Sequence, residues 1–148
     1  MHRLVLIPPP LLAIMLAGGG LGLGSIFDDL PTFAARPLGA LLMAAGCLLI
    51  VSTLLTFRQS RTTVIPHGNP TVLITDGPYS WSRNPIYLGL LTGLLGFALY
   101  FGNLFLFLAP PLFAGLIGTI HVSHEETKLW NRFSRVYAEY RDRVERWF

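Results

Sequence analysis

The sequence predicts an all-α integral membrane protein with four transmembrane helices, the last two forming a helical hairpin, and a carboxy-terminal amphipathic helix. Three observations support this fold class. Hydrophobic residues make up 52% of the 148 residues and charged residues 13%, with a mean hydropathy of +0.54, so water cannot solvate most of the chain. Three long runs carry no charge, and the basic residues flank these runs. The length predicts a single domain over 1–148.

The first two uncharged runs, 4–27 and 37–57, predict two transmembrane helices within 1–58. Each run can cross a hydrocarbon core of ~30 Å at a rise of ~1.5 Å per residue. The first run begins with three prolines at 8–10 and continues with glycines at 18–20, 22 and 24. This predicts an irregular start, then a smooth face for close helix packing. A cleaved signal peptide is the competing interpretation, but the run is long for one and further runs follow.

The third uncharged run, 85–120, has 36 residues and predicts a hairpin over 85–123. A single helix of this length would reach ~54 Å, too long for one crossing even with tilt. The turn is predicted at Gly102-Asn103, because both residues tolerate positive φ. Each arm then has about 17 residues, near the lower limit for a span. Pro110-Pro111 would kink the second arm or, alternatively, mark the turn.

The basic residues predict the orientation. Four spans place the amino terminus, the segment 58–84 and the tail after His121 on one side of the membrane. Ten of the 11 Lys and Arg residues fall there, whereas the other side has only Arg36, beside Asp28 and Asp29. The positive-inside rule therefore puts both termini and the loop in the cytoplasm. The ten residues are Arg3, Arg58, Arg61, Arg83, Lys128, Arg132, Arg135, Arg141, Arg143 and Arg146.

Composition also narrows the partners. The net charge is +3, but because the basic residues flank apolar runs, anionic lipid headgroups are expected as partners rather than nucleic acid. The single cysteine, Cys47, lies in an apolar run and is expected to be a small packing residue. No Cys/His cluster has metal-ligand spacing and no Gly-rich phosphate loop is present, so no metal site is predicted.

A polar and aromatic stretch stands directly before the third apolar run. Residues 59–84 contain too many prolines and glycines for a long helix, and 71–75 is a short β-prone run expected to be extended. Between Pro78 and Pro85 lie two aromatic residues, two serines, Arg83 and Asn84. Trp, Tyr and Arg are common at the headgroup level, so an interfacial anchor is one interpretation. A binding site is the other.

A second polar cluster, 121–128, precedes apolar residues at spacings of three and four, which predict an amphipathic helix over 124–148. Most of that helix is expected to be an interfacial membrane element. Glu125 and Glu126 are the exception, because acidic residues beside anionic lipid suggest a cation to bind, either a ligand's or that of Arg83. His121 lies one helical turn from Glu125 and shares its face.

These two clusters carry a resemblance. The pattern Gly77-Pro78-Tyr79…Ser82-Arg83-Asn84-Pro85-Ile86-Tyr87-Leu88-Gly89, then Glu125-Glu126, Leu129, Phe133, Tyr137, Tyr140, Val144 and Arg146, resembles the isoprenylcysteine carboxyl methyltransferase family, to which phospholipid methyltransferases are related. The resemblance covers roughly residue 62 to the end. It implies a membrane enzyme that uses S-adenosylmethionine and releases S-adenosylhomocysteine. The loop, hairpin and tail helix would close over the cofactor at the cytoplasmic face, and a lipophilic acceptor would enter from the bilayer.

The resemblance also implies roles for individual residues. His121 falls where the isoprenylcysteine enzymes place an arginine that contacts the substrate. With Arg83 it would orient the acceptor, and Glu126 would pair with Arg83; these three are the candidate catalytic residues. The candidate cofactor-binding residues are Thr71, Val72, Leu73, Ile74, Tyr79, Asn84, Pro85, Ile86, Tyr87 and Glu125.

Three positions depart from the family pattern. The usual Arg-His-Pro reads Arg83-Asn84-Pro85, and asparagine can donate and accept hydrogen bonds but cannot act as a titrating base. The usual Phe-Gly reads Phe133-Ser134, which is expected to be a minor change. His121 lacks the permanent charge and bidentate fork of arginine, which weakens the case for a prenylcysteine carboxylate as acceptor.

The residue chemistry agrees with a methyl donor that carries both charges. A sulfonium and an ammonium call for carboxylates or aromatic faces, and a carboxylate calls for a group such as Arg83. Two alternatives remain. Membrane sterol and enone reductases share part of the pattern but bind NADPH, for whose 2′-phosphate only Arg58 and Arg61 are available. A non-catalytic scaffold would use both clusters as interfacial anchors. The acceptor and the oligomeric state stay open. The residues that could bind the sulfonium and the ammonium of the cofactor are Glu125, Glu126, Tyr79, Tyr87 and Trp81.

Overall fold

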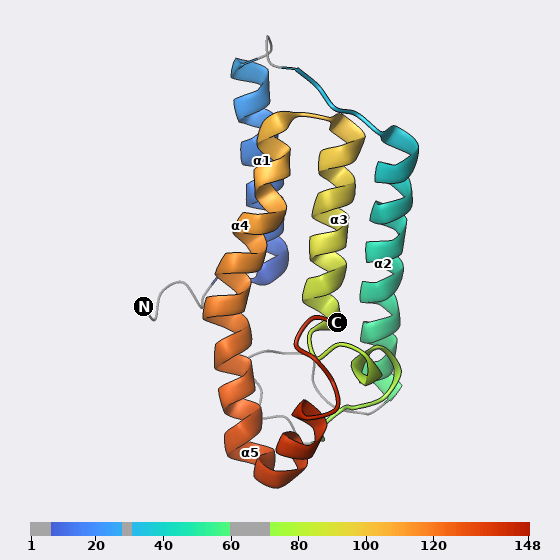
Figure 1. The fold of residues 1–148 in the computed structure, drawn as a ribbon, viewed down its shortest axis with the longest axis vertical. Coiled ribbons are helices and arrows are strands. Elements are labelled where there is room, and N and C mark those ends of the chain that lie inside the picture. The colour runs from blue at the N-terminus through green and yellow to red at the C-terminus, as the bar shows by residue number, and fades with distance from the viewer. Residues whose placement is uncertain (1–6, 28–30, 60–71) are drawn as a thin grey trace.

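The computed structural model describes residues 7–27, 31–59 and 72–148, and every regular element in these ranges is helical. Helices α1 to α4 run side by side along the long axis of the molecule, and α5 continues α4 beyond the end of the bundle (Figure 1). The elements are α1 (Pro9–Ile26), α2 (Arg36–Gln59), the 3₁₀-helix η2 (Gly77–Ser80), α3 (Pro85–Phe101), the 3₁₀-helix η3 (Leu104–Leu108), α4 (Ala109–Leu116), the π-helix η4 (Ile117–Val122) and α5 (Ser123–Arg141).

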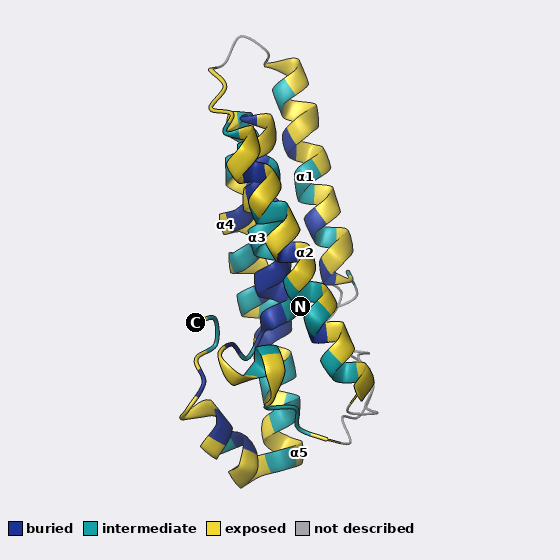
Figure 2. Ribbon diagram, turned by 90° about the vertical axis from the view of Figure 1, so that its right-hand side faces the viewer, coloured by how far each residue is buried: buried dark blue, intermediate teal, exposed yellow. Residues whose placement is uncertain are grey.

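Three of the described helices are long and apolar enough to cross a membrane: α1, α2 and the continuous helix Leu104–Arg141. The fourth apolar helix, α3, has 17 residues and is therefore only ~25 Å long. The outer faces of α1 and α2 are exposed (Figure 2) and carry large hydrophobic side chains such as Leu41 and Leu48. Cys47 is exposed on this surface instead of packing in the core, because it points away from the neighbouring helices.

The predicted hairpin turn at Gly102-Asn103 is confirmed. Gly102 ends α3 with a φ of 71°, in the left-handed region that glycine adopts without strain. The Asn103 side chain then caps η3 by accepting a hydrogen bond of 2.8 Å from the Phe105 N–H. Pro110 lies in the first turn of α4, where its missing N–H costs nothing. The proline pair therefore starts a helix and does not form the turn.

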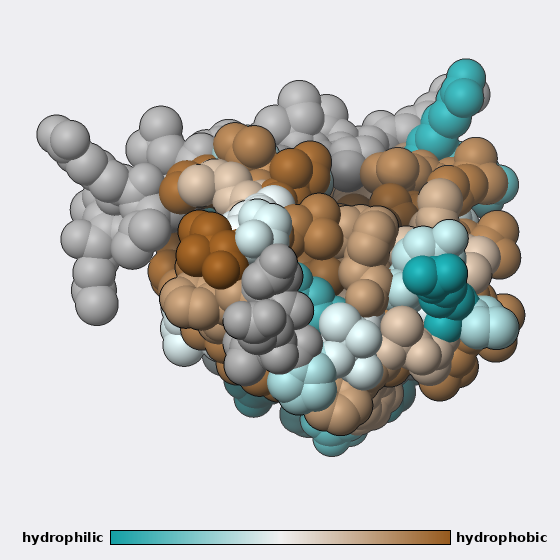
Figure 3. All heavy atoms as spheres, turned by 90° about the horizontal axis from the view of Figure 1, so that it is seen from above, coloured by the Kyte–Doolittle hydropathy of each residue, from teal (hydrophilic) through white to brown (hydrophobic). Residues whose placement is uncertain are grey.

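The linker between α1 and α2 packs onto this turn. The Phe33 N–H donates to the Gly102 carbonyl and the Ala35 N–H to the Leu99 carbonyl, both at 2.8 Å. A Cβ on Gly102 would lie 2.4 Å from the Ala34 nitrogen, so the close approach also requires glycine here. Figure 3 views this end of the molecule, where hydrophobic residues cover most of the visible described surface.

The tightest helix packing joins α2 and α3 through two pairs of glycines. A Cβ on Gly46 would lie 2.5 Å from the Gly89 carbonyl oxygen, and a Cβ on Gly96 would lie 2.7 Å from the Gly39 carbonyl oxygen. The two backbones can approach this closely only because the side chains are absent. We call this contact the glycine seam. It holds α3, whose first turn carries part of the candidate site.

The prominent glycines of α1 contribute less than the sequence predicts. Gly20 packs against Leu106, and Gly24 leaves room for the Asn103 side chain, whose amide is 3.3 Å from the Gly20 carbonyl. Nothing lies within 4 Å of the Cβ positions of Gly18, Gly19 and Gly22. The expected smooth face is thus used at two glycines only, because α1 contacts the hairpin along a narrow line.

The tail differs from the predicted helix over 124–148. Helix α5 ends at Arg141, and the chain bends inside it at Ser134, with φ 38° and ψ −105°. Ser134 has the only positive φ of a non-glycine residue in the described part of the chain. Such a conformation costs a non-glycine residue roughly 1–2 kcal/mol. The substitution of serine for the usual glycine therefore falls at the bend that sends the tail back toward the start of α3 (Figure 1).

Candidate active site

The candidate site lies at the end of the bundle where η2, α3, α5 and the carboxy-terminal residues meet (Figure 1). Gly77 opens η2 with a φ of 59°, and a Cβ there would lie 3.0 Å from the Thr56 hydroxyl of α2. Pro85 is the first residue of α3 and is buried, as a helix N1 proline can be without losing a hydrogen bond. Gly77 and Pro85 thus set the backbone path that leads into α3.

The two polar clusters of the sequence meet through one hydrogen bond. The Tyr87 hydroxyl donates to Glu125 Oε1 at 2.6 Å. Tyr87 is the third residue of α3 and Glu125 the third of α5, so the bond joins the starts of two helices. Tyr87 is buried and Glu125 half-buried. A carboxylate so shielded from water interacts strongly with any cation beside it.

Tyr79 and Phe57 form an aromatic wall near the Glu125 carboxylate. The Tyr79 ring packs edge-on against Phe57, with the centroids 5.7 Å apart at 85°. The Tyr79 backbone carbonyl accepts a hydrogen bond of 2.8 Å from the Tyr140 hydroxyl. Burial, followed by the nearby Glu125 carboxylate, raises the pKa of the Tyr79 phenol above its usual value, so Tyr79 stays neutral at physiological pH.

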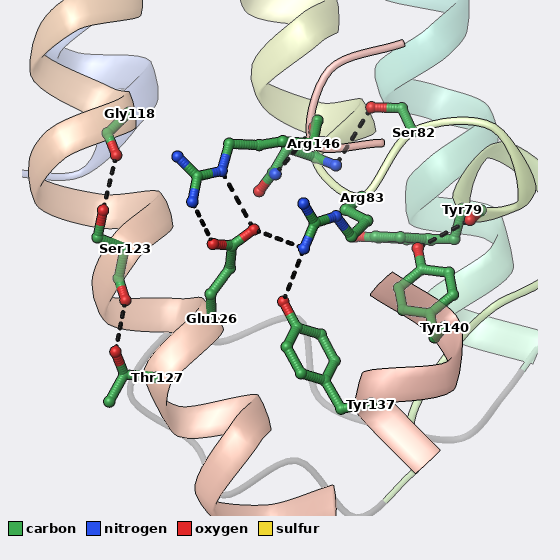
Figure 4. Close-up of polar contacts among 11 residues, drawn as sticks. Tyr79, Ser82, Arg83, Gly118, Ser123, Glu126, Thr127, Tyr137, Tyr140 and Arg146 are labelled. Atoms are coloured by element: carbon green, nitrogen blue, oxygen red, sulfur yellow. Dashed lines mark hydrogen bonds and ion pairs between the residues drawn. The ribbon is translucent and has the colours of Figure 1, made fainter. Parts of the chain in front are cut away.

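A network of two arginines and one carboxylate lies beside this wall (Figure 4). Glu126 Oε1 lies 3.0 Å from Arg83 Nη1, and Glu126 Oε2 lies 2.5 Å from Arg146 Nη2. The side chains of Arg83 and Glu126 are only 10% and 17% exposed, whereas that of Arg146 is 42% exposed. Arg83 Nη1 also donates to the Tyr137 hydroxyl at 3.4 Å. One buried carboxylate thus neutralises one of two guanidinium groups.

Asn84 supports the same region from the other side. Its backbone N–H donates to the Ser82 hydroxyl at 3.2 Å, and its side-chain amide donates to the Arg146 carbonyl at 3.1 Å. Both Asn84 and Ser82 are buried. The Asn84 amide therefore binds the carboxy-terminal chain. An amide does not ionise, so this hydrogen bond does not depend on pH.

His121 contacts the segment before α1. It is buried in η4, and its Nε2 lies 3.1 Å from the carbonyl oxygen of Ile7, just before α1. A carbonyl can only accept, so Nε2 carries the proton in this contact. The π-helical turn of η4 changes the register of the helix between His121 and Glu125. The expectation that His121 and Glu125 share one face assumed a regular α-helix, and the π-helical turn departs from that geometry.

Comparison with known proteins identifies the family. The sequence model of the family described as phospholipid methyltransferase matches residues 34–136, more than half of the chain. The chain belongs to the phospholipid methyltransferase family. This confirms the superfamily inferred from the two sequence motifs and makes the protein a member of a membrane methyltransferase family.

Two relatives of this family member are similar in sequence. A protein-S-isoprenylcysteine O-methyltransferase of Saccharomyces cerevisiae is 29% identical over 138 residues, covering 80% of this chain and 54% of the yeast protein. The chain thus spans about half the length of that relative. An uncharacterized protein of Haemophilus influenzae is 36% identical over 62 residues, 42% of this chain and 98% of that protein. No solved structure gives a significant match.

The remaining predicted cofactor residues are spread around the site of this methyltransferase family member. Thr71 lies outside the described residues. Leu73 packs on the small core of Tyr137, Tyr140 and Val144, whereas Val72 is exposed. Ile74 and Ile86 are half-buried. Residues 72–75 form no strand, and Leu73 is the residue of this run that packs on the tail.

Sequence reasoning missed part of the site that lies at the carboxy terminus. Tyr137, Tyr140 and Arg146 bond to Arg83, Tyr79 and Glu126 respectively. All three contributors follow residue 136, where the family match ends. The resemblance included these residues in its pattern, and that was the available signal. A straight helix over 124–148 would not bring Arg146 back to Glu126, and the bend at Ser134 was not foreseen.

Proposed function

We propose that the protein is an integral membrane methyltransferase that moves a methyl group from S-adenosylmethionine to a lipophilic acceptor. The acceptor would be an isoprenylcysteine-like carboxylate, a lipid amine or a thiol. The observation that carries the proposal is the Tyr87–Glu125 hydrogen bond. It joins the polar stretch before α3 to the acidic pair of α5, and thereby makes one site from two motifs that the sequence separates by 38 positions.

The residues fit the charges of this cofactor. A sulfonium and an ammonium group are stabilised by a carboxylate and by aromatic faces. Glu125 supplies the carboxylate, while Tyr87 and Tyr79 supply neutral rings beside it. The cofactor's own carboxylate needs a cationic donor. Arg83 has a buried Nε–H with no hydrogen-bond partner among the described residues, and its guanidinium shares its only carboxylate with Arg146.

The chain's contribution to the reaction would be positioning in a place shielded from water. S-adenosylmethionine supplies an electrophilic methyl group and leaves as S-adenosylhomocysteine. Methyl transfer is an in-line displacement that consumes a positive charge, so shielding from water favours it. Aligning donor and acceptor is worth ~7–11 kcal/mol of the barrier. We assign Glu125 and Tyr87 to holding the cofactor. Arg83 and His121 would orient the acceptor or complete the polar network around the cofactor. No strong base is needed for a carboxylate or thiolate acceptor.

The whole chain would act as one domain with a cytoplasmic site. Figure 1 places the loop end of α2, the starts of α1 and α3, α5 and the carboxy terminus toward the same end of the bundle. Eight of the 11 basic residues belong to these described segments. The positive-inside rule therefore supports a cytoplasmic location for this end, with membrane lipid around the helices.

Binding measurements on the detergent-purified protein test the proposal. Isothermal titration calorimetry would compare S-adenosylmethionine with NADPH, using wild type, Glu125→Gln and the matched control Glu139→Gln. Glu139 lies on the same helix but pairs only with the exposed Arg135. We expect saturable binding of S-adenosylmethionine alone, at least about tenfold weaker in Glu125→Gln, because a charged hydrogen-bond partner is worth ~1.5–3 kcal/mol. The Glu139→Gln control should bind like wild type.

Other outcomes point to the alternatives. Binding of NADPH in place of S-adenosylmethionine would move the protein to the reductases that share part of the sequence pattern. Binding of neither by a folded protein would support a non-catalytic scaffold. Equal affinity in wild type and Glu125→Gln would remove Glu125 from the cofactor site.

A further inference from the structure

The seven residues after α5 cross the start of α3 and are tied to it by the backbone. We call residues 142–148 the carboxy-terminal strap. The Arg83 N–H donates to the Glu145 carbonyl at 3.0 Å, and the Asn84 side-chain amide donates to the Arg146 carbonyl at 3.1 Å. These bonds place the strap directly beside the two residues that precede Pro85. Its position is therefore set by polar contacts with the candidate site.

An ion pair ties the strap to α5 as well. Arg146 binds Glu126 through two nitrogens, Nη2 at 2.5 Å to Oε2 and Nε at 3.3 Å to Oε1. The same carboxylate binds Arg83 at 3.0 Å. Figure 4 shows Glu126 between the two guanidinium groups. Arg146 thus holds Glu126 in the orientation that also receives Arg83.

The end of the strap packs on the hydrophobic core that contains Tyr87. Trp147 is half-buried and packs against the core cluster that contains Tyr87, Ile117 and Val122. One of its ring carbons lies 3.8 Å from the Cβ position of Gly118 in η4. Phe148 follows and is 83% exposed. The indole therefore lies against η4 and against the core cluster that contains Tyr87, the partner of Glu125.

The contacts that hold the strap differ from those that pack the helices together. Besides the packing of Val144 and Trp147, hydrogen bonds and one ion pair tie the strap to the described part of the chain, and the Arg146 side chain is 42% exposed. Each hydrogen bond contributes only ~0.5–1.5 kcal/mol net, because water can replace it, and Glu126 keeps Arg83 as its partner when Arg146 leaves. The strap can therefore leave while the helices stay packed.

We propose that the carboxy-terminal strap is a latch over the candidate site, held shut by Arg146 on Glu126 and by Asn84 on the Arg146 carbonyl. Release of the latch opens the side of the Tyr87–Glu125 pair for ligand exchange. Arg146 and Asn84 are positioning residues in this account, since they act through the strap. The identity of the exchanging ligand, S-adenosylmethionine, rests on the proposed function; the latch itself does not.

Spin labelling of the strap tests the latch without any ligand. Glu145 has an exposed side chain on the part of the strap whose backbone carbonyl accepts the Arg83 N–H. A nitroxide at Glu145→Cys, in a Cys47→Ser background and in lipid nanodiscs, would report mobility by electron paramagnetic resonance. We expect a restrained label in this parent and a mobile one after Arg146→Met or Asn84→Asp. The matched controls are Arg143→Met, whose guanidinium bonds only to the Glu139 carbonyl one turn back, and Asn131→Asp on the exposed face of α5. Both should leave the label restrained.

The rate of S-adenosylmethionine dissociation gives a second readout that a purely structural role would not change. We expect it to rise at least fivefold in Arg146→Met and Asn84→Asp and to stay unchanged in the two controls. An immobile label in Arg146→Met would overturn the latch. A mobile label with an unchanged dissociation rate would overturn its control of ligand exchange. If wild type binds no S-adenosylmethionine, the proposed function fails, and label mobility alone decides whether the latch exists.

Discussion

The glycine seam and the candidate site join the same helix α3 to its neighbours by opposite means. In the seam, Gly46 and Gly89 remove side chains so that the α2 and α3 backbones touch. At the site, long side chains reach across a wider gap, as when Glu126 binds Arg83 and Arg146. The seam contains no charged residue. The site contains four charged side chains among neutral tyrosines: Arg83, Glu125, Glu126 and Arg146.

This difference assigns separate tasks to the two regions. A backbone contact made by glycines has one geometry, so the seam fixes where the first turn of α3 stands. Ion pairs and hydrogen bonds can be exchanged with a ligand or with water, so the site can open and close. The seam therefore supplies rigidity for Tyr87, and the polar end supplies the charges and the movable cover.

The strongest test of this contrast removes the carboxylate between the two arginines. Glu126→Ala leaves the Arg83 guanidinium buried without a partner charge, and breaking a buried pair in this way costs ~3–5 kcal/mol. Glu139→Ala removes an exposed pair with Arg135 on the same helix and should cost at most about 0.5 kcal/mol. Denaturant titration in micelles measures both free energies of unfolding. Equal losses would show that the polar end does not depend on burial.

The seam should respond to a single methyl group. In Gly46→Ala the new Cβ would meet the Gly89 carbonyl at 2.5 Å, and forcing the helices apart should cost ~1–3 kcal/mol. Gly93→Ala is the matched control, because nothing lies within 4 Å of its Cβ position and alanine favours a helix by ~1 kcal/mol. We expect the control to be neutral or stabilised in the same titration. A stable Gly46→Ala protein would refute the backbone contact.

The bend in α5 predicts a smaller change of opposite sign. Ser134→Gly should stabilise the protein by ~1 kcal/mol, because glycine adopts the positive φ of this position without strain. Ser123→Gly, in regular helical geometry near the start of α5, should destabilise it by a similar amount. Thermal unfolding of both variants would show the opposite shifts. Destabilisation by Ser134→Gly would mean that the bend is not strained.

The parts that sequence analysis predicted correctly depend on local signals. Gly102-Asn103 turns the hairpin because the two residues themselves favour it, and Arg83 pairs with Glu126 because few other charges lie nearby. The glycine seam was missed because its members, such as Gly39 and Gly96, stand singly in the sequence and matter only once two helices meet. The conspicuous glycines of α1 had the stronger pattern and the weaker contacts.

The tail shows the other limit of sequence reasoning. Helical spacing of apolar residues continues past Ser134, so periodicity predicts a straight helix there. Tertiary contacts override it, since Tyr137 and Tyr140 bond to Arg83 and Tyr79. A serine at positive φ gives no propensity signal, and only the comparison of Phe133-Ser134 with the family's Phe-Gly pointed to this position.

The most direct test of a single site built from two motifs is a double-mutant cycle on S-adenosylmethionine affinity. Tyr87→Phe and Glu125→Gln would be measured singly and together by calorimetry. Because the Tyr87 hydroxyl acts through its bond to Glu125, the double variant should bind no more weakly than Glu125→Gln alone, a coupling of more than about 1 kcal/mol. Additive losses would mean that the two residues act independently. Unchanged affinity in all three variants would contradict the site itself.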